Sequence, residues 1–134
     1  MTPRAIFDSM RAQWLANQPT FEADLLAADV VIETPFAAPG RPARTVGKQR
    51  VLEYTRGSSA VFPVRFDDCR NVVVHETTDP EVIVVEYELV GTHTATGATA
   101  SAPFIGVLRT RDGKLAHWRE YQHTLAIAQA VGQA

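Results

Sequence analysis

Residues 110–123, Thr-Arg-Asp-Gly-Lys-Leu-Ala-His-Trp-Arg-Glu-Tyr-Gln-His, decide the fold. The pair Asp112-Gly113 is typical of a tight hairpin turn, because both residue types tolerate the positive φ angles that such a turn needs. It joins an extended segment that ends at Thr110 to a second one over 114–123. A link this short requires the two segments to be antiparallel neighbours in a sheet.

The segment 115–123 carries polar side chains on both faces. Successive side chains of a strand point to opposite sides. One face therefore holds Trp118, Glu120 and Gln122, and the other holds His117, Arg119, Tyr121 and His123. The sequence does not decide which face is internal. If it is the first, Glu120 lies beside an indole and an amide in a partly apolar setting, which raises a carboxyl pKa towards neutrality.

The second half of the chain reads as strands over 64–76, 81–94, 99–110 and 114–123. Turn signals separate them: Thr78-Asp79-Pro80, Thr96-Gly97 and Asp112-Gly113. Short links favour an antiparallel meander, which an earlier strand around Val30 joins.

The first half is mainly helical in pattern. A helix begins at Pro3 with Thr2 as its N-cap and ends before Pro19, and a second, short helix follows from Thr20. A third begins at Lys48 and stops near Gly57, and a final short helix covers 124–132. The proline-rich segment 35–42 is a surface loop and a candidate rim over a cleft. This element order predicts an α+β fold in which three N-terminal helices cover one face of a curved sheet around a cavity.

The strand over 82–90 has two contrasting rows of side chains. Ile83, Val85, Tyr87 and Leu89 form an apolar row, and Val82, Val84, Glu86, Glu88 and Val90 form the other. If the glutamate row lines the cavity, the apolar row is left outside and requires a partner chain. That arrangement predicts a homodimer packed sheet to sheet.

Length and composition narrow the functional class. The 134 residues, 46% of them apolar, suit one soluble domain, and a net charge of −2 with scattered cations argues against nucleic acid as a partner. With one cysteine, Cys69, and no apolar run of membrane length or signal-peptide type, we expect a cytoplasmic protein with no membrane association. The four histidines have no recognised ligand spacing and no dinucleotide or phosphate-binding motif is present, so we expect no metal and no cofactor.

Several short motifs in the second half resemble a known family. They are Glu76-Thr77-Thr78-Asp79-Pro80, Ile83-Val84-Val85-Glu86, Asp112-Gly113-Lys114-Leu115 and Arg119-Glu120-Tyr121. With the element order, they resemble the SnoaL-like branch of the nuclear-transport-factor-2-like superfamily, including its small phenazine-biosynthesis proteins. The resemblance implies a cone-shaped α+β barrel, commonly dimeric, in which the glutamate of the Arg-Glu-aromatic triplet, Glu120 here, is the catalytic acid or base.

Two more specific activities of the superfamily lack their residues. The positions that hold an Arg-x-Asp pair and a Tyr/Asn pair in the related epoxide hydrolases hold Glu86, Glu88, Ile32 and Thr34 here, so we reject epoxide hydrolysis. No Tyr and protonated Asp pair typical of ketosteroid isomerases is identifiable.

The sequence thus supports two hypotheses. The first is a cofactor-independent acid/base enzyme, a cyclase or isomerase, that acts on a small apolar or aromatic carbonyl compound through Glu120. Its expected substrate-binding residues are Glu86, Glu88, Trp118, Gln122, Trp14, Tyr54 and Phe104. The alternative is a non-catalytic module that binds a small molecule or dimerises. Only the enzyme requires a carboxyl whose pKa lies near the working pH.

Overall fold

The Asp112-Gly113 turn forms as predicted, with φ angles of 53° and 75° at its two central residues. It closes the hairpin between β5 (Thr99–Arg111) and β6 (Lys114–Gln122). In this computed structural model, which describes residues 1–132, β3 (Val64–Glu76) and β4 (Val82–His93) continue the antiparallel meander. The four strands lie within one residue of their predicted bounds.

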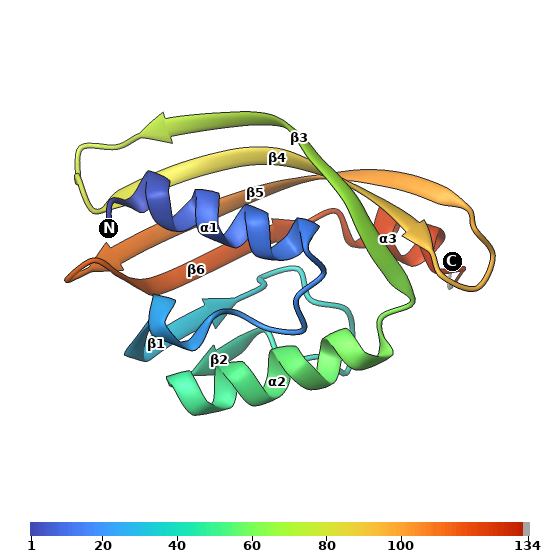
Figure 1. Ribbon diagram of the computed structural model, residues 1–134, viewed down its shortest axis with the longest axis horizontal. Helices are drawn as coiled ribbons and strands as arrows, with labels where there is room; N and C mark the ends of the chain where they lie inside the picture. The colour runs from blue at the N-terminus through green and yellow to red at the C-terminus, as the bar shows by residue number, and fades with distance from the viewer. Residues whose placement is uncertain (133–134) are drawn as a thin grey trace.

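The sheet has six strands in the order β2-β1-β6-β5-β4-β3 and remains open (Figure 1). β1 (Leu26–Glu33) pairs with β6 in parallel, and β2 (Arg44–Val46) adds an antiparallel edge. The sequence predicted neither the parallel pairing nor β2, which is three residues long and follows the proline-rich loop. As a result β6 lies inside the sheet, between β1 and β5.

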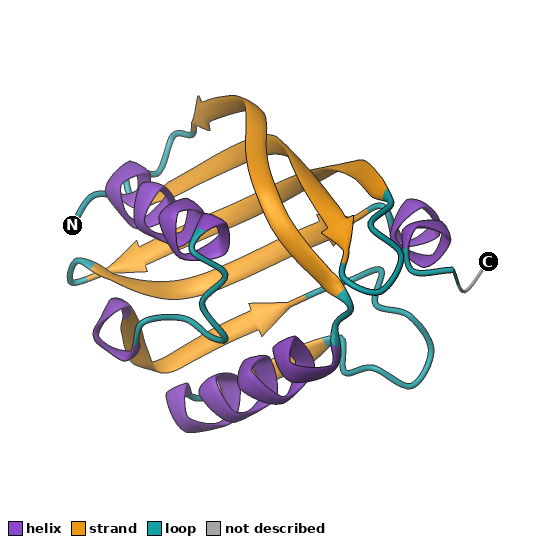
Figure 2. Cartoon of the chain, turned by 45° about the vertical axis from the view of Figure 1, so that its right-hand side comes forward, coloured by secondary structure: helices purple, strands orange, loops and turns teal. Residues whose placement is uncertain are grey.

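Helix α1 (Pro3–Leu15) begins as predicted, because the Thr2 hydroxyl accepts the Ala5 N–H at 3.1 Å and Pro3 occupies the first helical position. Its apolar stripe, Ile6, Phe7 and Met10, is fully buried. The helix lies across the concave face of the sheet (Figure 2). One side of the sheet therefore carries the core.

Two other helices differ from their predicted bounds. The short second helix is reduced to a 3-10 turn, η1 (Ala23–Leu25), because the chain has already entered β1 at Leu26. Helix α2 (Lys48–Val61) continues through Gly57, where the sequence predicted its end. Val51, near the start of the helix, is fully buried. Helix α3 (Thr124–Ala130) follows β6 at the far end of the sheet, and the loop 34–43 passes nearby (Figure 1).

None of the helices in residues 1–132 combines the length and the apolar character needed to cross a membrane. The single cysteine, Cys69, is fully buried in the core.

Candidate active site

The internal face of β6 is the one that carries Trp118, Glu120 and Gln122. Trp118 is only 3% exposed, and Glu120 and Gln122 line a cavity on the concave side. A glycine fixes this choice of face. Gly106 lies opposite Glu120 across the β5–β6 pair, and a Cβ on Gly106 would stand 2.1 Å from Cη2 of Trp118. The indole therefore packs directly on the backbone of Gly106, and any larger residue at position 106 would overlap it.

Tyr87 lies at the centre of an aromatic cluster on the same concave face. Its ring is 2% exposed and stacks on Phe104, with the ring centroids 5.5 Å apart. Trp14 of α1 lies 5.3 Å away and Trp118 lies 6.3 Å away, again between ring centroids. Other rings thus pack on the Tyr87 ring from several sides and fix the position of its hydroxyl, which can serve as a donor.

That hydroxyl donates to Oε2 of Glu120, and the amide of Gln122 donates to Oε1 at 2.9 Å. Burial raises the pKa of Glu120, while the hydrogen bonds from Gln122 and Tyr87 lower it, and the net direction is upwards. Burial, together with the adjacent carboxylate, also raises the pKa of Tyr87 well above its usual range, so Tyr87 remains a neutral donor. Glu120 is therefore an oriented carboxyl group whose proton affinity is increased.

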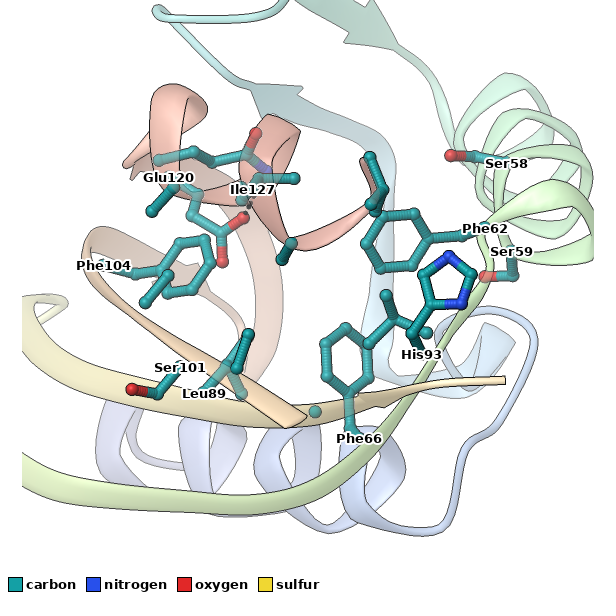
Figure 3. A pocket seen from close by; sticks show the side chains of 18 of the residues that line it. Ser58, Ser59, Phe62, Phe66, Leu89, His93, Ser101, Phe104, Glu120 and Ile127 are labelled. Atoms are coloured by element: carbon teal, nitrogen blue, oxygen red, sulfur yellow. Dashed lines mark hydrogen bonds between the residues drawn. The ribbon is translucent and has the colours of Figure 1, made fainter. Parts of the chain in front are cut away.

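The cavity beside Glu120 consists of two adjoining chambers of about 290 Å³ and about 790 Å³. Glu120 and Gln122 line both. The smaller chamber is bounded by the ends of β4 and β5 and by α3, and the larger by α1, β1 and α2. Apolar side chains predominate in the wall around Glu120, among them Phe104, Leu89 and Ile127 (Figure 3). Volumes of this order accommodate ligands of small-molecule size.

Most of the residues predicted to bind substrate do line this cavity. They are Trp14, Tyr54, Phe104, Trp118 and Gln122. The segment 35–42, predicted as a candidate rim, contributes Ala37, Ala38, Arg41 and Pro42 to the wall.

The placement predicted for Glu86 and Glu88 needs correction, because both lie on the opposite face of β4 from Tyr87. Glu86 contacts the His75 ring at 2.6 Å and Glu88 pairs with Arg70, all on the outer face of the sheet. The alternation is the physical reason: the apolar row with Ile83, Val85 and Leu89 is buried under α1, which turns the glutamates outward. Neither lines the cavity, so the three glutamates do not form a cluster.

The same result removes the argument for a partner chain. The apolar row of β4, which was expected to face outward if the glutamates lined the cavity, belongs to the core. The homodimer therefore stays a prediction, but an exposed apolar row no longer supports it. Glu33 does not line the cavity either, and it contacts His117 at 2.6 Å and Arg119 at 3.5 Å. Although burial would raise the pKa of Glu33, the charge of Arg119 and the contact with His117 lower it.

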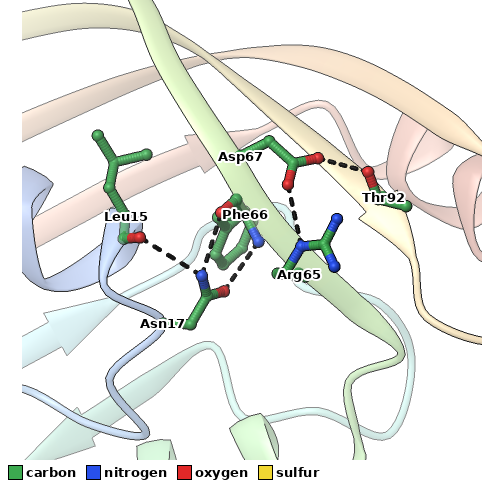
Figure 4. Close-up of polar contacts among 6 residues, drawn as sticks. All are labelled: Leu15, Asn17, Arg65, Phe66, Asp67 and Thr92. Atoms are coloured by element: carbon green, nitrogen blue, oxygen red, sulfur yellow. Dashed lines mark hydrogen bonds and ion pairs between the residues drawn. The ribbon is translucent and has the colours of Figure 1, made fainter.

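A side-chain clasp holds the wall between α1 and the edge strand β3. Asn17, which adopts a φ of 54° just after α1, accepts the Phe66 N–H through Oδ1 at 2.9 Å and donates to the Phe66 carbonyl through Nδ2 at 3.1 Å (Figure 4). Its amide therefore pairs with β3 as a neighbouring strand would. Since Asn17 and Phe66 both line the larger chamber, the clasp fixes one side of the cavity.

Sequence reasoning missed Tyr87 as a site residue. The signal was present, since a single tyrosine in an otherwise apolar buried row needs a partner for its hydroxyl. This signal identifies Glu120 as the partner only when the structure shows that the side chains of Tyr87 and Glu120 point to the same concave face. Within residues 1–132, no group of three or more His, Cys, Asp or Glu side chains is placed to hold a metal ion.

Comparisons with known proteins agree with this architecture. The SnoaL-like domain family matches residues 8–118, and the chain belongs to this family. An uncharacterised PhzA/B-like protein of Pseudomonas aeruginosa is 33% identical over 109 residues, which cover 81% of this chain and 75% of that protein.

Two solved structures show how closely the fold is shared. A candidate isomerase from Bacillus subtilis superposes with a TM-score of 0.88 at 23% identity, covering 98% of this chain and 94% of its own. A Δ5-3-ketosteroid isomerase from Mycobacterium sp. superposes with a TM-score of 0.73 at 19% identity, covering 94% and 97%. At these identities the likeness establishes the fold alone.

Proposed function

We propose that this protein is a cofactor-independent isomerase or cyclase in which Glu120 moves a proton on a small, largely apolar or aromatic carbonyl compound. The observation that carries the proposal is the pairing of Glu120 with Tyr87 and Gln122 at the wall of the cavity. The membership of the SnoaL-like family and the fold shared with a ketosteroid isomerase are consistent with it.

The chemistry begins with Glu120 as a carboxylate. It accepts a proton from the carbon next to the substrate carbonyl, and the electron pair of that C–H bond moves into an enolate. In an isomerase the protonated Glu120 returns the proton at a different carbon. In a cyclase the enolate carbon instead attacks a second carbonyl of the same molecule, and Glu120 protonates the new alkoxide. Either sequence ends with Glu120 ionised again.

The raised pKa of Glu120 suits this cycle. A carboxylate at its ordinary pKa is a weak base towards a C–H bond, and general base catalysis improves as the pKa approaches the working pH. The two hydrogen bonds fix the direction of the carboxylate oxygens, and the amide of Gln122 has a second N–H that can reach a substrate oxygen. The rings of Phe104 and Trp118 favour flat or cyclic substrates, because aromatic faces stack on such groups.

The test is proton exchange, which does not need the natural substrate. A panel of cyclic and aryl ketones is incubated in D₂O with the protein, and deuterium incorporation at the α-carbon is followed by ¹H NMR. We expect exchange above the buffer rate for ketones that fit the cavity, and Glu120→Gln should remove about 10²- to 10⁴-fold of the enhancement.

Glu86→Gln is the matched control, since it makes the same change on the outer face of the sheet, away from the cavity, and should exchange like the wild type. Exchange by Glu120→Gln at the wild-type rate would exclude Glu120 as the base. Ketones that bind without any exchange would instead support the non-catalytic binding module.

A further inference from the structure

The cavity changes in chemical character from one end to the other. Figure 3 shows Glu120 and Phe104 at one end and Ser58, Ser59 and His93 at the other, with the rings of Phe62 and Phe66 towards the second end. Within residues 1–132, Glu120 is the only acidic side chain that lines either chamber. The basic side chains in the lining are Arg41, Arg65 and His93. A carboxyl group and a basic region thus occupy different parts of one cavity.

Arg41 is the cation in this region that has no acidic partner. Arg65 pairs with Asp67 at 3.0 Å, whereas none of the ion pairs formed among residues 1–132 includes Arg41. The guanidinium of Arg41 instead reaches the Ser58 hydroxyl at 3.5 Å, and it lines both chambers. A guanidinium keeps its charge at all physiological pH values, so Arg41 adds an unpaired positive charge to the rim.

His93 adds a directed donor to the same end. Its Nδ1 accepts the N–H groups of Ala95 and Thr96 at 3.2 and 3.3 Å. The ring proton of neutral His93 therefore lies on Nε2, which becomes a donor. With the hydroxyls of Ser58 and Ser59, this end of the cavity is rich in hydrogen-bond donors, and no carboxylate from residues 1–132 lines it.

We propose that Arg41, Ser58, Ser59 and His93 form an anion subsite that binds a carboxylate of the substrate. The substrate is then an oxo acid, with its carbonyl end at Glu120, an apolar or aromatic body between the rings, and its carboxylate at Arg41. The placement of the carbonyl at Glu120 rests on the proposed function, whereas the anion subsite itself does not. The opposite orientation would bring the carboxylate of the substrate against that of Glu120, which like-charge repulsion disfavours.

The experiment uses ω-benzoylalkanoic acids of increasing chain length, each compared with its methyl ester. The dissociation constants of both are measured by calorimetry for the wild-type protein and its variants. Because Arg41 is exposed to solvent, we expect the best acid to bind about five- to tenfold more tightly than its ester, and this preference should fall as salt is added.

Three variants separate the possibilities. Arg41→Gln should abolish the preference for the acid, whereas Arg56→Gln should retain it, because Arg56 is exposed on α2 and does not line the cavity. Glu120→Gln should also retain it, so loss of exchange in that variant together with preserved acid preference separates the proton-transfer proposal from this one. Equal binding of acid and ester, no binding of any acid, or an unchanged preference in Arg41→Gln would overturn the subsite.

Discussion

Replacing Tyr87 by phenylalanine removes one hydroxyl and keeps the ring that packs between Phe104, Trp14 and Trp118. That hydroxyl is a donor to the charged form of Glu120, and burial already raises the pKa of the carboxyl. A hydrogen bond to a charged group contributes about 1.5–3 kcal/mol, so its loss should shift the ionisation equilibrium of Glu120 towards the protonated form by about ten- to a hundredfold. The pKa of Glu120 should therefore rise further in Tyr87→Phe.

The assay is the pH profile of deuterium exchange into an aryl ketone. Exchange increases with pH as Glu120 ionises, so the rising limb should move to higher pH in Tyr87→Phe, with a lower rate at neutral pH and recovery at alkaline pH. A carboxyl ¹³C titration of Glu120 checks the same shift directly.

Tyr54→Phe is the matched control. Tyr54 also lines the cavity, but the hydrogen bonds to the Glu120 carboxyl come from Tyr87 and Gln122. Superimposable profiles for Tyr87→Phe and the wild type would show that the hydroxyl does not act on the carboxyl. A uniform loss of rate at all pH values would assign Tyr87 a role other than tuning Glu120.

Three further predictions concern stability. Because the pKa of Glu120 is raised in the folded state, the stability that its protonated form contributes is present below the unfolded value of ~4.3 and is lost as pH rises through the folded pKa. In urea unfolding, Glu120→Gln should therefore gain stability relative to the wild type as pH increases across that window. A difference of the opposite sign would contradict the buried carboxyl. Gly106→Ala should lose about 1–3 kcal/mol and alter tryptophan fluorescence, because the new methyl group overlaps Trp118, whereas Gly57→Ala, with open space around it, should gain about 0.4–1 kcal/mol. Asn17→Gly keeps the positive φ but loses the clasp to β3, so thermal unfolding should show a loss of about 1–2 kcal/mol; wild-type stability would mean that the clasp is replaced by water.

The four strands β3 to β6 were predictable to within a residue because turn signals separate them. Turn pairs such as Asp112-Gly113 and Thr96-Gly97 end the strands regardless of the rest of the fold. The end of α2 was not predictable in this way, because a glycine can stand inside a helix as well as at its end, and α2 continues past Gly57 to Val61. The three residues of β2 carry too little pattern to be recognised without the strand they pair with.

The candidate site was predictable in its residue type but not in its orientation. Both faces of β6 are polar, so alternation alone could not distinguish the face of Glu120 from that of Arg119. The face of β6 that points inward is decided by Gly106 on β5, because only a glycine leaves room there for the indole of Trp118. The same long-range packing turned Glu86 outward and brought Tyr87 to Glu120, and none of these relations is local in the sequence.

The position of β6 also determines when the site can form during folding. β6 follows the other five strands of the sheet in the chain, yet it lies between β1 and β5, so about 90 residues of chain must be brought together for β1 to pair with it. Contacts this distant in sequence form late and slow the folding of a domain. Glu120 and Tyr87 both lie in the meander β4-β5-β6, whose strands are joined by short turns, so this pair can meet before β1 pairs with β6. The wall to which β1 contributes Ile32 is completed only when the distant pairing has formed, so the base is in place before the cavity around it is closed on that side.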